Sequence, residues 1–213
     1  MKHLQIAVIG TGYVGLVSGA CFAEFGVNVT CADIDEEKIQ RLEKGQIPFY
    51  EPGLSEKVKA NVAQGRLGFT TAVAAAIHDA LVVFIAVGTP GNRDGTPNLD
   101  AIEAVARQIG RNLSDYKVVV TKSTVPPRTG DRVRSIIEAE AEKGAEFDVV
   151  SNPEFLREGS AIEDFMRPDR IVIGAESERA VSIMKELYGP LYLVETPLDR
   201  KSTRLNSSHQ IIS

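Results

Sequence analysis

Apolar and polar positions along the chain define two kinds of segment. Short apolar runs, typical of strands buried on both faces of a sheet, alternate with helix-length stretches of mixed polarity. The pattern predicts strands at 4–9, 27–33, 67–71, 81–87, 117–124, 147–152 and 170–175, helices at 13–25, 35–45, 51–65, 72–80, 100–110, 128–143 and 177–188, and a closing apolar run at 191–196. This alternation predicts an α/β fold, a doubly wound and mostly parallel sheet with helices on both faces.

Glycine, proline and acidic residues mark the expected ends of several helices. Gly45 is expected to stop helix 35–45, and Pro52 is expected in the first turn of helix 51–65. Asp100 and Glu103 have the spacing of a capping box with Asp100 as the cap, and Gly110 is expected to end that helix.

Composition narrows the class of protein. The 213 residues are 43% hydrophobic and 25% charged, which is ordinary for a globular chain with a good core. The net charge of −5 argues against a nucleic-acid partner, and no apolar run approaches the ~20 residues of a membrane span. The two cysteines lie in apolar segments and match neither a disulfide framework nor a zinc site, so we expect no metal and a reducing, cytoplasmic location.

The last residues differ in character from the rest. Residues 1–197 are expected to form one domain, whereas 198–213 are polar, basic and without periodicity. Two interpretations of this tail remain open: a loop with a frayed end, or foreign sequence appended by read-through past the native reading frame.

A glycine pattern follows the first predicted strand and opens the first predicted helix. Gly10, Gly12 and Gly15 form G-x-G-x-x-G, in which the glycines permit a tight turn, close approach of a pyrophosphate, and close helix–strand packing. Asp33 ends the second strand, where a carboxylate accepts hydrogen bonds from ribose hydroxyls and repels a 2′-phosphate. The pattern therefore predicts a Rossmann-like fold that binds NAD rather than NADP. The alternative is a structural turn, with Asp33 capping the next helix.

Ligands of open parallel sheets lie beyond the carboxyl ends of the strands. The residues directly after three strands are "GTPGNRDGTPNLD", "TKSTVPPRTG" and "NPEFLREG". We expect all three segments on the edge that carries the glycine loop.

These segments resemble a known family. "GTGYVGL", "YEPGL" (50–54), "VGTP" (87–90), "KSTVPPRTG" (122–130) and "NPEFLREGSAIEDFMRPDRIVIG" (152–174) are similar to motifs of the nucleotide-sugar 6-dehydrogenases, over residues 3 to about 197. The resemblance implies oxidation of the C6 alcohol of a sugar nucleotide to a carboxylate, with two NAD and one water. In the family a first hydride transfer to NAD gives an aldehyde, which a cysteine traps as a thiohemiacetal. A second hydride transfer gives a thioester, and water hydrolyses that thioester. UDP-glucose is the implied substrate; GDP-mannose and UDP-N-acetyl-mannosamine are the alternatives.

The resemblance also implies roles for individual residues. Glu154 would handle the attacking water, Thr124 would hold that water or a sugar hydroxyl, and Glu158 would work beside them. Implied cofactor contacts are Gly10, Gly12, Tyr13, Val14, Gly15, Asp33, Lys38, Thr89, Thr124 and Glu158, and implied substrate contacts are Glu154, Phe155, Leu156, Arg157 and Glu158.

Each role has a plainer alternative. In the plainer interpretation, Glu154 and Glu158 are solvated surface acids. Thr124 then only makes hydrogen bonds within a turn before Pro126, and Arg157 pairs with a nearby acid. His78, next to Asp79 in an alanine-rich helix, is expected at the surface rather than as a base.

The family's nucleophilic cysteine has no counterpart here. Cys21 is expected in the core of the first helix and Cys31 within the second strand, and neither matches the family's downstream "G-x-C" segment. We therefore expect an incomplete part of an enzyme that binds NAD but does not complete the oxidation, from a parent that is a homo-oligomer. A dinucleotide-binding module without chemistry is the alternative from another class.

Overall fold

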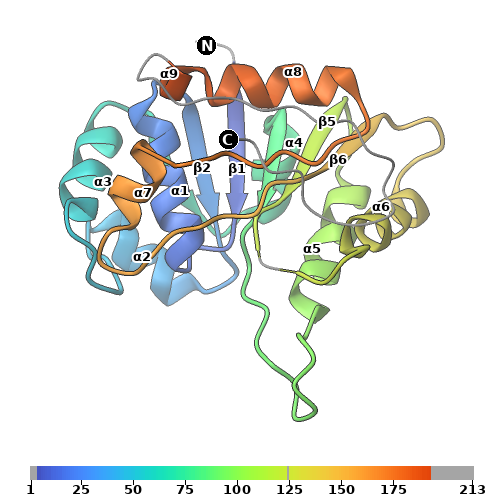
Figure 1. The fold of residues 1–213 in the computed structure, drawn as a ribbon, viewed down its shortest axis with the longest axis horizontal. Helices are drawn as coiled ribbons and strands as arrows, with labels where there is room; N and C mark the ends of the chain where they lie inside the picture. The colour runs from blue at the N-terminus through green and yellow to red at the C-terminus, as the bar shows by residue number, and fades with distance from the viewer. Residues whose placement is uncertain (1–3, 124, 193–213) are drawn as a thin grey trace.

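The computed structural model describes residues 4–123 and 125–192 (Figure 1). Strands and helices alternate along most of this range, as the pattern of apolar positions predicts. In chain order the elements are β1 Gln5–Ile9, α1 Tyr13–Glu24, β2 Asn28–Ala32, α2 Glu36–Glu43, α3 Leu54–Ala63, β3 Leu67–Thr70, α4 Val73–Asp79, β4 Val82–Ile85, α5 Asp100–Arg111, β5 Lys117–Thr121, α6 Thr129–Glu140, β6 Phe147–Ser151, α7 Ala161–Met166, α8 Glu178–Leu187 and α9 Gly189–Tyr192.

The six strands form one sheet in the order β3-β2-β1-β4-β5-β6, and all their pairings are parallel. The order reverses between β1 and β4, which pair with each other although β2, β3 and several helices lie between them in sequence. Because every strand runs the same way, all carboxyl ends meet at one edge, the lower edge in Figure 1. The predicted fold class is thus confirmed.

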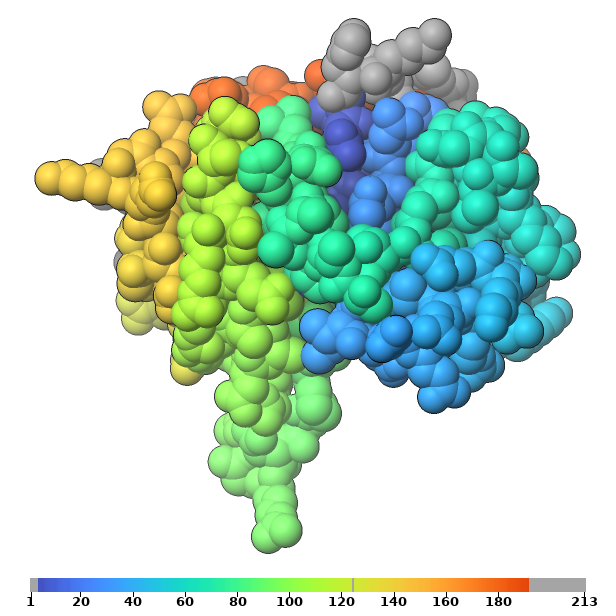
Figure 2. All heavy atoms as spheres, turned by 180° about the vertical axis from the view of Figure 1, so that it is seen from behind, coloured from blue at the N-terminus to red at the C-terminus, as the bar shows by residue number. Residues whose placement is uncertain are grey.

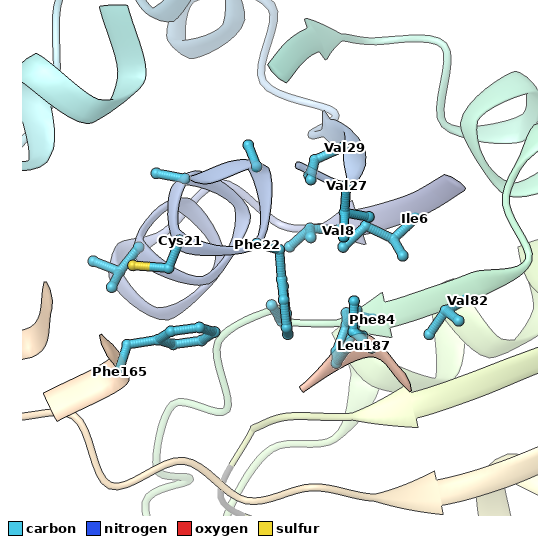
Figure 3. Packing of buried hydrophobic residues seen from close by; sticks show 14 of the residues in the cluster. Ile6, Val8, Cys21, Phe22, Val27, Val29, Val82, Phe84, Phe165 and Leu187 are labelled. Atoms are coloured by element: carbon cyan, nitrogen blue, oxygen red, sulfur yellow. The ribbon is translucent and has the colours of Figure 1, made fainter. Parts of the chain in front are cut away.

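Both faces of the sheet are covered. One apolar cluster joins the sheet to α1, α3, α7 and α8, and a second joins the opposite face to α4, α5 and α6. The side chain of Phe22 lies at the centre of the first cluster, with its ring centroid 5.0 Å from those of Phe84 and Phe165 and 5.3 Å from that of Tyr188 (Figure 3). Replacing such a buried ring by alanine typically costs about 3–5 kcal/mol, so this cluster fixes α1 and the glycine loop before it.

Two predicted helix boundaries are wrong. Pro52 lies in the turn before α3, because Gly53, with φ +78°, is the N-cap and the helix begins at Leu54. Asp100 is the first helical residue rather than the cap, and its backbone N–H donates to the Asn98 side chain (2.8 Å).

Gly110 does not end its helix; it lies within α5. A Cβ at this position would come within 2.7 Å of the Glu140 side chain and 2.8 Å of the Ile137 carbonyl, both on α6. The glycine therefore permits the close packing of α5 on α6, a requirement that arises only from tertiary structure.

The predicted strand at 170–175 does not form either. Among described residues this segment makes one isolated antiparallel bridge, between Gly174 and Ser151, and has no other regular secondary structure. Of the apolar run at 191–196, the first two residues belong to α9 and the remainder lies outside the described residues, as does the tail.

Residues 88–98 form a narrow arm beyond the carboxyl edge of the sheet, visible from both sides (Figures 1 and 2). Its two limbs pair through Asn92 N–H to Thr96 O (2.7 Å) and Asn98 N–H to Pro90 O (2.8 Å). In the described part of the chain, no helix is long and apolar enough to cross a membrane.

Candidate functional site

The three glycines of the loop after β1 have three different surroundings. Gly10 has φ +104°, and a Cβ there would lie 2.7 Å from the Ala86 carbonyl oxygen at the end of β4. A Cβ on Gly15 would lie 1.9 Å from the Gly10 carbonyl oxygen, so the first turn of α1 packs directly on the loop. A Cβ on Gly12 would meet nothing within 4 Å. Gly10 and Gly15 are thus required for packing, whereas Gly12 leaves open space above the start of the helix, as a pyrophosphate needs.

Asp33 directly follows β2 and turns its carboxylate back to the glycine loop. Its Oδ2 accepts hydrogen bonds from Thr11 N–H (2.8 Å), Thr11 Oγ1 (2.7 Å) and Lys38 Nζ (3.0 Å), and its Oδ1 accepts one from Asp35 N–H (3.1 Å). Burial alone would raise the pKa of Asp33, but these hydrogen bonds outweigh it and lower the pKa. The carboxylate therefore stays charged, and among the described residues Oδ1 accepts fewer hydrogen bonds than Oδ2.

The other predicted cofactor contacts on α1 and α2 have distinct settings. Val14 is half-buried in the first turn of α1. The Lys38 ammonium lies 3.0 Å from Asp33 Oδ2. Tyr13 also lies in the first turn of α1, but its hydroxyl points away from the loop, to the Glu51 carboxylate and the Arg157 carbonyl.

The strand ends beyond the loop converge as predicted. Thr89, half-buried, follows β4, and Ser123 follows β5. The Ser123 hydroxyl donates to the Val87 carbonyl (2.7 Å), which ties these two strand ends together. Thr124 lies outside the described residues.

The segment after β6 carries the predicted carboxylates. Glu154 is half-buried and accepts a hydrogen bond from Leu156 N–H, while Glu158 is exposed. Phe155 is 59% exposed. Beside this segment lies a cavity of about 620 Å³ lined by Glu154, Phe155 and Leu156, by Lys122, and by residues of 163–171.

Arg157 pairs locally, as the plainer alternative has it. Its guanidinium donates to both carboxylate oxygens of Asp164, at 2.6 and 3.2 Å, and its backbone N–H donates to Asp164 as well (2.9 Å). The side chain of Arg157 remains 77% exposed, so the pair fixes its direction without covering it.

Two buried charged residues near these segments, Glu51 and Lys122, were not singled out from the sequence. Glu51, within "YEPGL", is 5% exposed and accepts from the hydroxyl of Tyr13 and from the N–H groups of Gly159 and Ala161 (both 2.8 Å). Lys122, within "KST", is 3% exposed. Both fall in motifs of the resemblance, which was the only signal in the sequence.

Lys122 is a buried residue of the cavity lining, which also includes Glu154. Its ammonium is 3.3 Å from Asn152 Oδ1 and 3.4 Å from the Tyr188 hydroxyl, and it lies 5.6 Å from the centre of the Phe165 ring. Burial lowers the pKa of Lys122 to about 8, against the opposing effect of the Glu154 charge.

The two cysteines are buried, as expected. Cys21 and Cys31 are both 0% exposed, and burial raises the pKa of each thiol to about 12. Neither faces the carboxyl edge as an accessible nucleophile. His78 is exposed and contacts Asp79 at 3.0 Å, as expected of a surface histidine.

A glycine loop opening a helix, an acid at the end of the next strand and a strand order that reverses beside the loop define a dinucleotide-binding protein of the Rossmann type. The profile of the UDP-glucose/GDP-mannose dehydrogenase family, NAD binding domain, matches residues 4–192. The chain belongs to this family, and the matched residues are its NAD-binding domain. The predicted family and cofactor are confirmed.

Similar proteins extend well beyond this chain. It is 58% identical over 198 residues to a UDP-glucose 6-dehydrogenase of Rhizobium meliloti and 52% identical over 197 residues to UDP-glucose 6-dehydrogenase TuaD of Bacillus subtilis. Each alignment covers 92% of this chain, but only 45% and 43% of those relatives.

Solved structures give the same picture. A UDP-glucose dehydrogenase from Pyrobaculum islandicum superposes with a TM-score of 0.86 at 44% identity, over 89% of this chain and 45% of that one. A GDP-mannose dehydrogenase from Pseudomonas aeruginosa superposes with a TM-score of 0.84 at 37% identity, over 89% and 44%. The chain spans under half the length of these relatives.

Proposed function

We propose that this domain serves a nucleotide-sugar 6-dehydrogenase that oxidises UDP-glucose to UDP-glucuronate. The proposal rests on one observation: the glycine loop, Asp33, Thr89 and the segment with Glu154 and Glu158 share the carboxyl edge of one sheet. A dinucleotide over the loop therefore reaches toward the carboxylates. The names of the relatives, and their identity of 52–58%, support UDP-glucose over other sugar nucleotides.

The residues present fit NAD. Gly12 leaves space where the pyrophosphate would lie, and the start of α1 supplies N–H groups for it. The Asp33 carboxylate is the acceptor for a ribose hydroxyl, and its Oδ1 accepts one hydrogen bond from the described residues. NAD, when bound there, accepts a hydride from the substrate carbon. The charge of Asp33 opposes a 2′-phosphate, which supports NAD over NADP.

The chain's own part in the chemistry lies in polar groups of the segments that follow β5 and β6. Glu154 orients or deprotonates a water molecule, Thr124 holds that water or a sugar hydroxyl, and Glu158 stands at the cofactor side. Phe155, Leu156 and Arg157 line the sugar nucleotide, with Arg157 fixed by Asp164. The accessible thiol that the family's reaction needs would come from another part of the complete protein, because both thiols here are buried.

Calorimetric titration of this chain with NADH, NADPH and UDP-glucose tests the cofactor and the completeness of the domain. We expect binding of NADH, weaker binding of NADPH, and no formation of UDP-glucuronate when NAD and UDP-glucose are supplied together. Substantial turnover by the chain alone would contradict the assignment of the nucleophile to another part of the protein.

The role of Glu154 is tested in the complete protein by Glu154→Gln. If the carboxylate handles the water, the variant releases little product and a covalent enzyme–sugar adduct accumulates, which intact-protein mass spectrometry detects. Unchanged turnover would remove Glu154 from the mechanism and would favour a binding module or a different base.

A further inference from the structure

Glu51 is a buried carboxylate that joins three segments distant in the sequence. Its Oε2 accepts from the Tyr13 hydroxyl and from Gly159 N–H (2.8 Å), and its Oε1 accepts from Ala161 N–H (2.8 Å). The donors lie 38 residues before and 108 and 110 residues after Glu51. The carboxylate therefore holds the start of α1 against the loop that follows Glu158.

The donors to Glu51 are neutral groups. Among the described residues, no lysine, arginine or histidine nitrogen lies within ion-pair distance of its carboxylate. A buried charge without a countercharge is a poor source of stability, and apolar side chains of similar volume often serve better. A carboxylate is the side chain that can accept from a hydroxyl and from two separate N–H groups at once.

Tyr13 connects this carboxylate to the cofactor loop. It follows Gly12 directly, and its hydroxyl lies within hydrogen-bond distance of both Glu51 and the Arg157 carbonyl (3.3 Å). Its ring packs on Phe49, with centroids 5.0 Å apart. Helix α7, which begins at Ala161, packs beside α1 on the same face of the sheet (Figure 1).

We infer that Glu51, acting through Tyr13, is a positioning residue that couples the dinucleotide loop to the segment with Glu154 and Glu158. The inference rests on the proposed function, in which that segment serves the substrate. A dinucleotide that orders the start of α1 also orders Tyr13, and Glu51 passes this restraint to the backbone of Gly159 and Ala161. The carboxylates thus take their working position when the cofactor site fills.

Hydrogen–deuterium exchange of the full 213-residue chain, with and without NAD, tests the coupling. In the wild type, we expect NAD to slow amide exchange in peptides of the glycine loop and also in peptides covering 156–162. Tyr13→Phe keeps the ring that packs on Phe49 and removes only the hydroxyl. In this variant NAD should still protect the glycine loop but no longer residues 156–162.

Glu51→Gln tests the carboxylate itself. The side-chain NH₂ of the new glutamine would face a backbone N–H donor, so a charge-assisted hydrogen bond is lost. Without NAD, the amides of Gly159 and Ala161 should therefore exchange about tenfold faster, the factor expected for one such bond. Glu56→Gln is the matched control: it removes the same charge from an exposed position on α3 and should leave both exchange patterns unchanged.

Each outcome has a separate meaning. If NAD protects nothing in the wild type, the proposed function fails together with the coupling. Protection of the glycine loop without protection of 156–162 in the wild type overturns the coupling alone. NAD-dependent protection of 156–162 that persists in Tyr13→Phe also overturns the coupling. Because Glu51 is unchanged in Tyr13→Phe, this test holds even if Glu51→Gln does not fold.

Discussion

The carboxylate of Asp33 holds Thr11 by two hydrogen bonds, from the Thr11 backbone N–H at 2.8 Å and from its hydroxyl at 2.7 Å. The acid at the end of β2 therefore supports the glycine loop, in addition to the role of ribose acceptor that we propose for it. Its Oδ2 already accepts three donors, whereas Oδ1 accepts one, from Asp35. A ribose hydroxyl would thus bind at Oδ1 without dismantling the loop.

Asp33→Asn should weaken NADH binding by about 10- to 100-fold, because a hydrogen bond to a charged acceptor contributes about 1.5–3 kcal/mol. It should also narrow the preference for NADH over NADPH, since the repulsive charge is gone. Titration with both cofactors measures the two effects. Thr11→Val is the control, because it removes the Thr11 hydroxyl that donates to Asp33. This variant should lose about 1 kcal/mol of stability and should keep the preference for NADH over NADPH. An equal change of preference in both variants would assign the effect to loop geometry.

Gly12→Ala should affect NADH binding, whereas Gly15→Ala should affect the stability of the fold. A Cβ at position 12 would have open space, so the melting temperature of the first variant should stay close to that of the wild type while NADH binding is lost. A Cβ at position 15 would collide with the Gly10 carbonyl oxygen, so α1 must shift, at a cost of about 1–3 kcal/mol or more. Thermal unfolding and cofactor titration of both variants check this. Full NADH affinity in Gly12→Ala would argue against a pyrophosphate at that point.

Lys122 should make stability rise with pH above about 8. Its folded-state pKa is lowered to about 8, below the ordinary value of about 10.4. Between these values the unfolded chain holds more protons than the folded chain, so stability increases as pH rises through this window. Below pH 8 the full penalty of the buried charge remains. Relative to Lys122→Met, the wild type should gain about 2 kcal/mol between pH 7 and pH 9.5.

Urea unfolding of the wild type and of Lys122→Met at both pH values measures this difference in the free energy of unfolding. The other titrating groups are the same in both proteins, so their contributions cancel. Lys122→Met keeps the length of the apolar stem, so packing around Phe165 is largely preserved. A difference between the two proteins that does not change with pH would mean that Lys122 reaches solvent.

The two thiols should be unreactive in the folded chain. With the pKa of both Cys21 and Cys31 raised to about 12 by burial, the thiolate fraction at pH 8 falls on the order of a thousandfold below that of a free cysteine. A colorimetric thiol reagent should therefore react slowly with native protein and titrate two thiols per chain in denaturant. Rapid modification of one thiol in the native chain would reopen the question of a nucleophile within this domain.

Local sequence determined the fold class, the alternation of strands and helices as far as β6, and the chemistry of the glycine loop. The periodicity of apolar positions reports which segments are buried on both faces, and Gly10, Gly12, Gly15 and Asp33 act within one strand–turn–helix–strand unit. The family motifs also identified the segment that carries Glu154 and Glu158. None of these inferences needed to know which distant residues touch.

Tertiary structure alone decided what the charged residues do. From the sequence, Glu51 is an ordinary loop acid. In the fold it accepts hydrogen bonds from the N–H groups of Gly159 and Ala161, more than a hundred residues away. Gly110 reads as a helix stop until α6 packs against it. The sequence shows which residues are polar or small. Their burial and hydrogen-bond partners depend on contacts between distant segments, and those contacts form only when the chain folds.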